Sequence, residues 1–428
     1  MNHEQFKLLT QKAPLLMDGA TGTHLQAAGM PTGVAPELWV LDNPSVLQNL
    51  QRKYMAAGSS IVFTATFGAN RAKMARHKID GSGIEQINRL LAEVSVHARD
   101  SFCRTLPERQ VMVAGDIGPT GHFLYPAGDL SLSELIEIFR EQIRGLLAGG
   151  VDLFVIETMM DLAEVRAAVL AIQAECDLPV LASLTFAENG RTLAGNSPLA
   201  CLITLAALGV DACGINCSFG PEKLGELIEP LRSITPIPLL LKPNAGLPIL
   251  VDGQTIFPMQ ALPFAAAMKP LALSPVRLLG GCCGTTPDHI AALAGTLEES
   301  ENRLMGELPE LPAIICSARQ SWLTSDCSAL PTVDCYDPDA LVDEVIEQLD
   351  DDSPAVILDF DNLPEETPVT EILEALQQLQ VMAAVPLIFR AGNNELLEQL
   401  LRHYCGRAGV IGRQPAKSYG SLTVCPDG

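Results

Sequence analysis

The stretch VRLLGGCCGTTPDHI, residues 276–290, joins a short apolar run to the start of a helix through a turn that holds two adjacent cysteines. An apolar run of this kind is typical of a parallel strand buried on both faces, and TPD at 286–288 is typical of the first residues of a helix. A disulfide between neighbouring residues is strained. The pair Cys282 and Cys283 is therefore better explained as two thiolates directed at one metal ion, with a further ligand from elsewhere in the chain.

The same unit of apolar run, turn and helical pattern recurs from Pro14 to Thr296. The other runs are PLLMDGATG, SSIVFTATFGAN, VMVAGDIGPTG, LFVIETM, VLASLTF, ACGINCSFGP and PLLLKPNAG. Helical patterns of about 10–15 residues lie between them. Eight strand–helix units in about 280 residues predict a (β/α)8 TIM barrel, with a small C-terminal α/β module after it.

Chemically unusual residues fall at the ends of the predicted strands. In a (β/α)8 barrel the carboxyl ends of the strands form the active site, so residues that are scattered in sequence are expected to converge there. These residues are Asp18, Thr66, Asp116, Glu157, Thr185, Asn216, Cys217, Asn244, Cys282 and Cys283.

Three of these residues predict a metal site. Cys217 ends the sixth run and Cys282 and Cys283 end the eighth, and barrel geometry would bring the two loops together. Three thiolates suit zinc and leave a fourth position for a substrate, whereas soft sulfur donors disfavour magnesium and calcium. Buried inert cysteines are one alternative. A closed structural zinc site is another, but it would need a fourth ligand, and His289 is expected to be a capping or surface residue instead.

An open zinc–thiolate site has a particular chemical use. Zinc keeps a bound thiol deprotonated at neutral pH, so the thiolate becomes available as a nucleophile. Three anionic sulfur ligands also reduce the Lewis acidity of the metal toward water. The pattern therefore favours alkylation of a substrate thiol over hydrolysis.

The chain changes character after Thr296. We expect the barrel to cover residues 1–299, a charged linker to cover 300–312 and a small acidic α/β module to cover 313–428. Helices are predicted at 341–349 and in NELLEQLLRHYCG, and strands in PAVILDF and VPLIF. About 110 residues are too few for a second complete barrel.

Charge and hydropathy exclude several classes of partner. The net charge is −23, and residues 301–428 hold 22 acidic and 7 basic side chains. Such a surface argues against nucleic acid or an anionic membrane as the main partner. The sequence shows no apolar run long enough for a membrane span and no signal-peptide pattern, so a cytoplasmic location is expected. Most of the 12 cysteines should then be reduced.

Several motifs together resemble a known family. MDGATGTHLQ, TATFGAN, GDIGPTG, IETM, GINCSFGP, PNAG and GGCCGTTPDHI resemble the homocysteine S-methyltransferase family over about residues 10–297. Within that family they are most similar to the homocysteine-binding module of cobalamin-dependent methionine synthase. The betaine– and S-methylmethionine–homocysteine methyltransferases are more distant.

The resemblance implies a role for each matching residue. Cys217, Cys282 and Cys283 would bind zinc and support catalysis, and Asp18 and Glu157 would hold the amino group of L-homocysteine. The backbone amides of Gly19 and Ala20 would lie near its carboxylate, Thr66, Phe67 and Gly68 would line the pocket, and Asn244 would approach zinc when no substrate is bound. The alternatives are a helix cap for Asp18 and an ion pair within the barrel for Glu157.

The resemblance leaves the methyl donor open. The chain contains no Asp-x-His-x-x-Gly stretch, so we expect no cobalamin-binding module in it. A methyl-corrinoid such as methylcobalamin, carried by a separate protein, is the expected donor. PAVILDF and VPLIF faintly resemble strands of a folate-binding barrel, which suggests a truncated remnant or a docking module.

Two alternatives differ in donor or in class. A sulfonium or quaternary ammonium donor, of the S-methylmethionine or betaine type, would usually need an aromatic cage. The candidate aromatic residues are few: Phe67, Phe186, Phe219, Phe123 and Tyr125. A zinc-stabilised barrel that serves as a non-catalytic assembly subunit would bind zinc but not homocysteine.

Overall fold

The computed structural model describes residues 1–428 except 80, 252–253, 300–305, 325–326, 350–352 and 425–428. Eight parallel strands form the first sheet in the order β1-β10-β7-β6-β5-β4-β3-β2. A parallel bridge between Met17 and Ile61 joins the two ends of this order and closes the barrel. The strands are β1 (Leu15–Leu16), β2 (Ile61–Phe63), β3 (Met112–Ile117), β4 (Leu153–Met159), β5 (Val180–Leu184), β6 (Ala212–Cys217), β7 (Leu239–Pro243) and β10 (Val276–Leu279). The predicted (β/α)8 barrel is confirmed.

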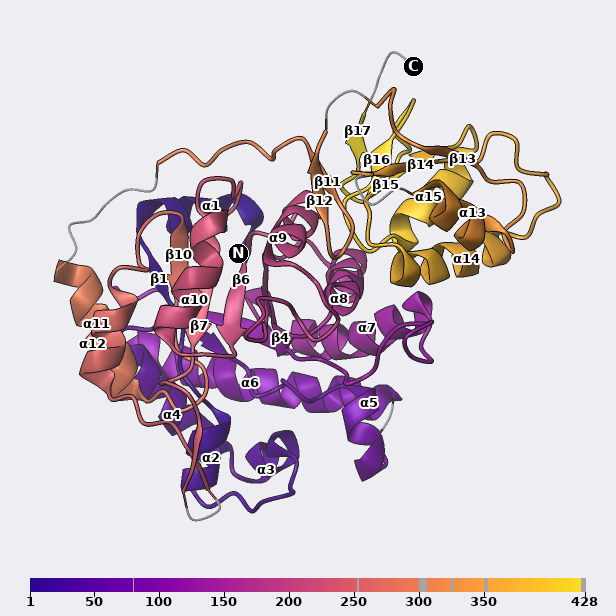
Figure 1. Cartoon of the computed structure of the whole chain (residues 1–428). Coiled ribbons are helices and arrows are strands. Elements are labelled where there is room, and N and C mark those ends of the chain that lie inside the picture. Colours follow the sequence, from indigo (N-terminus) through magenta and orange to yellow (C-terminus); the bar gives the residue numbers. More distant parts are fainter. Residues whose placement is uncertain (80, 252–253, 300–305, 325–326, 350–352, 425–428) are drawn as a thin grey trace.

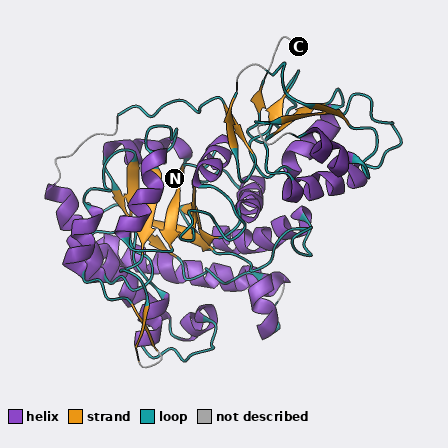
Figure 2. Ribbon diagram, in the orientation of Figure 1, coloured by secondary structure: helices purple, strands orange, loops and turns teal. Residues whose placement is uncertain are grey.

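Helices surround this barrel (Figures 1 and 2). They are α1 (His3–Lys12), α2 (Gly22–Ala27), α3 (Pro36–Asp42), α4 (Pro44–Ala56), α5 (Arg71–Met74), α6 (Gly81–Thr105), α7 (Leu132–Ala148), α8 (Leu162–Glu175), α9 (Pro198–Ala207), α10 (Pro221–Ile228), α11 (Ala261–Met268) and α12 (Pro287–Glu299), with 3-10 turns at Ala75–His77 and Glu229–Leu231. Helices α9 and α12 begin at Pro198 and Pro287, as the Ser-Pro and Thr-Pro-Asp signals predict. Within the described residues, none of the helices combines the length and the hydrophobicity that a bilayer crossing requires.

The strands are largely apolar because they are buried on both faces. In β4, Leu153 and Val155 belong to the cluster inside the barrel, whereas Phe154 and Ile156 pack against the surrounding helices. Phe6 of α1 joins the inner cluster and is 1% exposed. The interior is therefore a packed core, which leaves the opposite end of the barrel, where the strands have their carboxyl ends, for a site.

The hairpin between β7 and α11 was not predicted. In it, strands β8 (Ile249–Val251) and β9 (Gln254–Ile256) pair in antiparallel fashion, and α11 begins at Ala261. Strands of three residues are too short to produce a recognisable alternation.

A second sheet follows the barrel. Its strands β13 (Thr332–Asp334), β14 (Val356–Asp359), β15 (Leu387–Arg390), β16 (Gly409–Val410) and β17 (Leu422–Thr423) are parallel and stand in chain order. Figure 1 shows the connecting helices α13 (Leu341–Gln348), α14 (Val369–Met382) and α15 (Asn394–His403) together on one side of it. Consecutive parallel strands with helices on one side are the arrangement of a barrel, here left open after five strands. A hairpin of β11 (Ile314–Cys316) and β12 (Ser321–Leu323) precedes them.

Two arginines bind the C-terminal ends of helices of the second sheet, one from the barrel and one from the β11–β12 hairpin. Arg166 of α8 is fully buried and donates hydrogen bonds to the carbonyl oxygens of Leu401 at 3.2 Å and Arg402 at 3.4 Å, in the last turn of α15. Arg319 donates to the carbonyl oxygens of Gln380 and Val381 near the end of α14. Cations at helix C-termini satisfy free carbonyl groups and interact favourably with the helix dipole.

We expect Arg166→Met to loosen this contact. The substitution leaves two buried carbonyl groups without their donor, and the free energy of unfolding should fall by about 1–3 kcal/mol. Arg89→Met is a matched control, because Arg89 forms only an exposed pair with Glu93. Thermal denaturation of both variants checks the prediction. Equal melting temperatures for the two would show that Arg166 does not support the interface.

Candidate metal centre and pocket

The structure brings the three predicted thiols together at the mouth of the barrel. Cys217 is the last residue of β6, and Cys282 and Cys283 follow β10 by three and four residues. Their Sγ atoms all lie within 4.8 Å of one another, and all three residues are partly exposed. This is the one group of possible metal ligands found among the described residues.

The loop after β7 holds the two cysteine-bearing loops in register. The amide of Cys282 donates to the carbonyl oxygen of Pro243 at 2.7 Å, and the amide of Ala245 donates to that of Cys283 at 2.9 Å. The amide of Cys283 donates to Asn244 Oδ1 at 3.1 Å. Asn244 therefore lies beside the thiol cluster, and its approach to zinc stays a prediction.

Unusual backbone conformations concentrate around this cluster. Thr158, Cys217 and Ser218 are non-glycine residues with φ of 60°, 59° and 60°. L-residues rarely adopt this left-handed region, and such strain is typical of functional sites. Gly284, next to Cys283, has φ of 78°, so the tight turn after the pair favours glycine.

The three thiols cannot all ionise by themselves. Hydrogen bonds from Cys282 and Cys283 to the Cys217 sulfur lower the pKa of Cys217, and the same contacts help to raise the pKa of Cys282 and Cys283. A cation at the centre of the cluster would remove this conflict by stabilising all three thiolates. The donor set therefore fits a soft divalent metal such as zinc, with a position left for a fourth ligand.

Acidic residues line the cavity beside the thiols. The cavity has a volume of about 260 Å³ and is lined by the three cysteines together with Asp18, Asp116, Glu157 and Lys242. Phe63 and Phe67 are its aromatic residues. Glu37 lines the cavity as well, and burial raises the pKa of each of the four carboxyl groups. A cavity with an excess of carboxylates is suited to a positively charged ligand.

Sequence analysis missed Lys242. Its Nζ lies 3.1 Å from Asp18 Oδ1 and 3.8 Å from Glu157 Oε2. Burial alone would lower the pKa of Lys242, but these two carboxylates raise it, so the lysine stays charged. A lysine inside the apolar run PLLLKPNAG was the signal, because a lysine buried in a strand needs an acidic partner. The alternative expectation for Glu157, an ion pair within the barrel, is thus partly met.

Asp18 is held firmly in the floor of the cavity. It is 1% exposed, and its Oδ2 accepts a hydrogen bond from the amide of Phe63 at 2.8 Å. Gly19 also lines the cavity, and a side chain at Gly19 would collide with Tyr54 and Thr285. The amide of Ala20 donates to Thr285 Oγ1 at 3.1 Å, so this donor already has a protein partner.

Not every residue of TATFG lines the cavity. Phe67 does. Thr66 lies deeper, and its hydroxyl donates to the carbonyl oxygen of Asp116 at 2.7 Å. The amide of Gly68 donates to Glu37 Oε1 at 2.6 Å. Thr66 and Gly68 therefore support the wall rather than form its surface.

His289 is a capping residue but not a surface residue. Its Nδ1 accepts a hydrogen bond from the amide of Thr286 at 3.2 Å, at the start of α12. Its Nε2 lies 2.9 Å from the carbonyl oxygen of Met259, and the residue is only 6% exposed. Of the two expected roles, capping or surface residue, the structure has the first, and Met259 in the loop before α11 lies against the ring.

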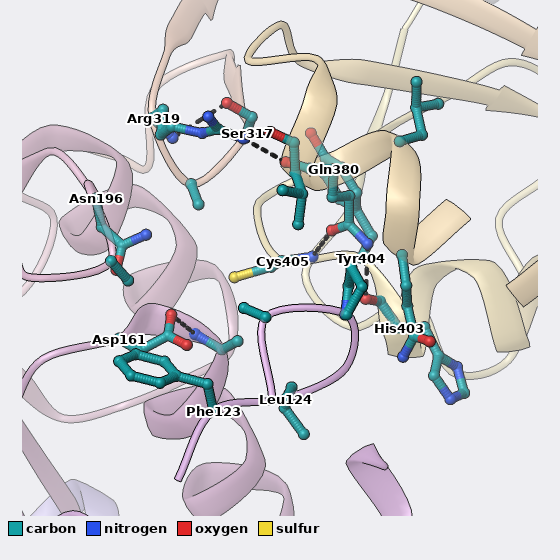
Figure 3. A pocket seen from close by; sticks show the side chains of 18 of the residues that line it. Phe123, Leu124, Asp161, Asn196, Ser317, Arg319, Gln380, His403, Tyr404 and Cys405 are labelled. Carbon is teal, nitrogen blue, oxygen red and sulfur yellow. Dashed lines mark hydrogen bonds between the residues drawn. The ribbon is translucent and has the colours of Figure 1, made fainter. Parts of the chain in front are cut away.

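A larger cavity lies between the barrel and the second sheet (Figure 3). Its volume is about 400 Å³. Its polar groups pair within the protein: Asp161 accepts from the amide of Ala163, Arg319 donates to Gln380, and Gln380 accepts from the amide of Cys405. The smaller cavity, by contrast, holds carboxylate oxygens without partners beside a thiol cluster. The smaller cavity is therefore the candidate functional site.

The fold and the cavity define a (β/α)8 barrel protein with a three-thiol candidate metal centre and an acidic pocket in its mouth. The family model for homocysteine S-methyltransferase matches residues 15–297. The chain belongs to the homocysteine S-methyltransferase family.

Known proteins resemble the barrel. The chain is 33% identical to methionine synthase of Mycobacterium leprae over 292 residues, which are 65% of this chain and 24% of that protein. It is 32% identical to methionine synthase of Mycobacterium tuberculosis over 302 residues, which are 68% and 25%. The chain thus spans about a quarter of the length of these curated relatives.

Solved structures show the same similarity. The metallated form of the homocysteine methyltransferase MmuM from Escherichia coli is 27% identical with a TM-score of 0.57, covering 67% of this chain and 98% of that chain. Its oxidised form is 28% identical with a TM-score of 0.58, covering 69% and 99%.

Proposed function

We propose that this chain transfers a methyl group to the sulfur of L-homocysteine and forms methionine, with zinc held by Cys217, Cys282 and Cys283. The observation that carries this proposal is one cavity that combines three clustered thiols with buried carboxylates. Zinc bound there would keep the thiol of the substrate in its deprotonated, nucleophilic form. The similar E. coli homocysteine methyltransferase has a metallated form, which supports metal binding by this chain.

The residues of the chain bind and orient the substrate. Asp18 and Glu157 receive the ammonium group, and Gly19 contributes its backbone near the substrate carboxylate. Lys242 neutralises part of the negative charge of the two carboxylates and holds both in place. In the reaction the homocysteine sulfur forms a bond to the methyl carbon, the bond from this carbon to the donor breaks, and its electron pair stays with the donor.

The donor in this proposal is a methyl-corrinoid carried by a separate protein. Both curated relatives are methionine synthases. The aromatic residues of the cavity are already engaged, because Lys242 Nζ lies 3.5 Å from the ring centre of Phe63 and Lys73 Nζ lies 4.6 Å from that of Phe67. These rings offer no free cage for an onium group. A sulfonium or quaternary ammonium donor is therefore the second candidate.

Residues 313–428 form a separate acidic module in this account, a remnant of a barrel or a docking module. Its helices and sheet have their own hydrophobic cluster, which includes Val356, Leu376 and Leu400. Half of the linker proposed at 300–312 lies outside the described residues. A reducing, cytoplasmic setting fits the ten free cysteines of the described residues, although Cys327 is in a disulfide.

An assay with three donors tests the function. The zinc-loaded chain is mixed with L-homocysteine and either methylcobalamin, S-methylmethionine or betaine, and methionine is measured. We expect methionine from methylcobalamin, with a matching change in the corrinoid spectrum, and none without zinc. Methionine from an onium donor alone would favour the second candidate. No methionine and no binding of homocysteine would favour the non-catalytic barrel.

A further inference from the structure

We infer that Asp116 is a further ligand for the ammonium group of the substrate, so that three carboxylates rather than two recognise an α-amino thiol. This inference rests on the proposed function and adds a specificity-determining residue to it. Asp116 lies near the end of β3 and lines the same cavity as Asp18 and Glu157.

The backbone of Asp116 is fully paired, but its side chain is not. Its amide donates to Thr64 Oγ1 at 2.9 Å, and its carbonyl oxygen accepts from Thr66 Oγ1 at 2.7 Å. Its Oδ1 is buried and has no hydrogen-bond partner in the described part of the chain. A buried polar atom without a partner costs free energy, so it needs an explanation beyond the fold.

The hydrogen bonds of the neighbouring acids show that the cavity lacks a donor. Glu157 Oε2 also lacks a hydrogen-bond partner among the described residues, because Lys242 at 3.8 Å is too far away. Glu37 accepts from Gly68 and Asp18 pairs with Lys242, so these two carboxylates have partners. Two buried carboxylate oxygens in one cavity therefore remain for a donor that the protein does not supply.

The charges point to a cation rather than to a neutral donor. Four acidic residues line the cavity, Asp18, Glu37, Asp116 and Glu157, and Lys242 is the one basic residue among the described residues that line it. Burial and the charge of Glu157 raise the pKa of Asp116, and the charge of Lys242 offsets this only in part. A ligand ammonium group can donate three hydrogen bonds and would supply both the donors and the charge.

Binding of two thiols to the zinc-loaded full chain tests this inference. L-homocysteine carries the amino group, and 4-sulfanylbutanoate keeps the thiol and carboxylate but lacks it. Titration calorimetry should show Asp116→Asn weakening homocysteine binding about ten- to hundredfold, while 4-sulfanylbutanoate changes less than about twofold. Asp161→Asn is the matched control, since Asp161 is an acid near the end of β4 that lines the other cavity; it should change neither affinity.

A second variant separates ligand binding from folding. Asp116→Ala removes the unpaired carboxyl, so it should melt at or above the wild-type temperature and show the same selective loss of homocysteine affinity. An equal loss for both thiols, a lower melting temperature, or unchanged homocysteine binding would overturn the inference. If the wild-type chain binds neither thiol, the proposed function fails, and the inference fails with it.

Discussion

Replacement of Cys282 by alanine is expected to remove both the metal and the methyl-transfer activity. The three sulfurs lie within 4.8 Å of one another, and backbone hydrogen bonds to Pro243 and Ala245 hold the Cys282–Cys283 pair in place. A full zinc ligand set contributes about 10–16 kcal/mol, so loss of one sulfur should weaken binding on the order of a hundred- to a thousandfold. Cys217→Ala and Cys283→Ala should behave alike.

Metal analysis after gel filtration, with an activity assay of the same samples, checks this prediction. Cys213→Ala is the matched control, because Cys213 lies in the same strand as Cys217 but is buried and outside the cluster. It should keep zinc and activity. A Cys282→Ala protein that retained both would show that Cys282 is not a ligand.

The second large effect is expected for Asp18→Asn. This change removes the charge that faces the substrate ammonium, so homocysteine affinity should fall about ten- to hundredfold while zinc is retained. Lys242 also loses its closest partner at 3.1 Å, and the broken buried pair should cost about 3–5 kcal/mol of stability. Calorimetric titration, metal analysis and thermal denaturation of one preparation measure all three quantities.

Asp177→Asn is the control for this prediction, because the Asp177 side chain is 96% exposed and lies outside the cavity. It should match the wild type in each measurement. Loss of zinc from Asp18→Asn would mean that Asp18 supports the metal centre. Unchanged homocysteine affinity would remove Asp18 from the substrate site.

The barrel could be predicted because its strands leave a strong pattern. Strands such as β4 are buried on both faces and therefore read as continuous apolar runs that end in polar residues. In the second sheet, helix α14 was not predicted. Strands β16 and β17 were not predicted either, and they have two residues each. Strands this short have no detectable period.

The residue types of the candidate site could be predicted from the sequence, but the contacts between their side chains could not. The thiols and Asp18 follow from residue type and strand ends. Lys242 was overlooked because its role depends on acids from β1 and β4, which only the closed barrel brings near. Thr66 was assigned to the pocket surface, but its hydroxyl turns to the backbone of β3 instead. Sequence places a residue at a strand end, and packing decides which way its side chain points.

X-ray absorption at the zinc edge tests whether the metal centre binds the substrate thiol. The spectrum of the zinc-loaded full chain is measured before and after addition of L-homocysteine. We expect three sulfur neighbours, one from each cysteine, at about 2.3 Å from zinc, and a fourth sulfur when the substrate thiol takes the open position. An unchanged sulfur count in the presence of saturating homocysteine would contradict the claim that this metal centre binds the substrate thiol.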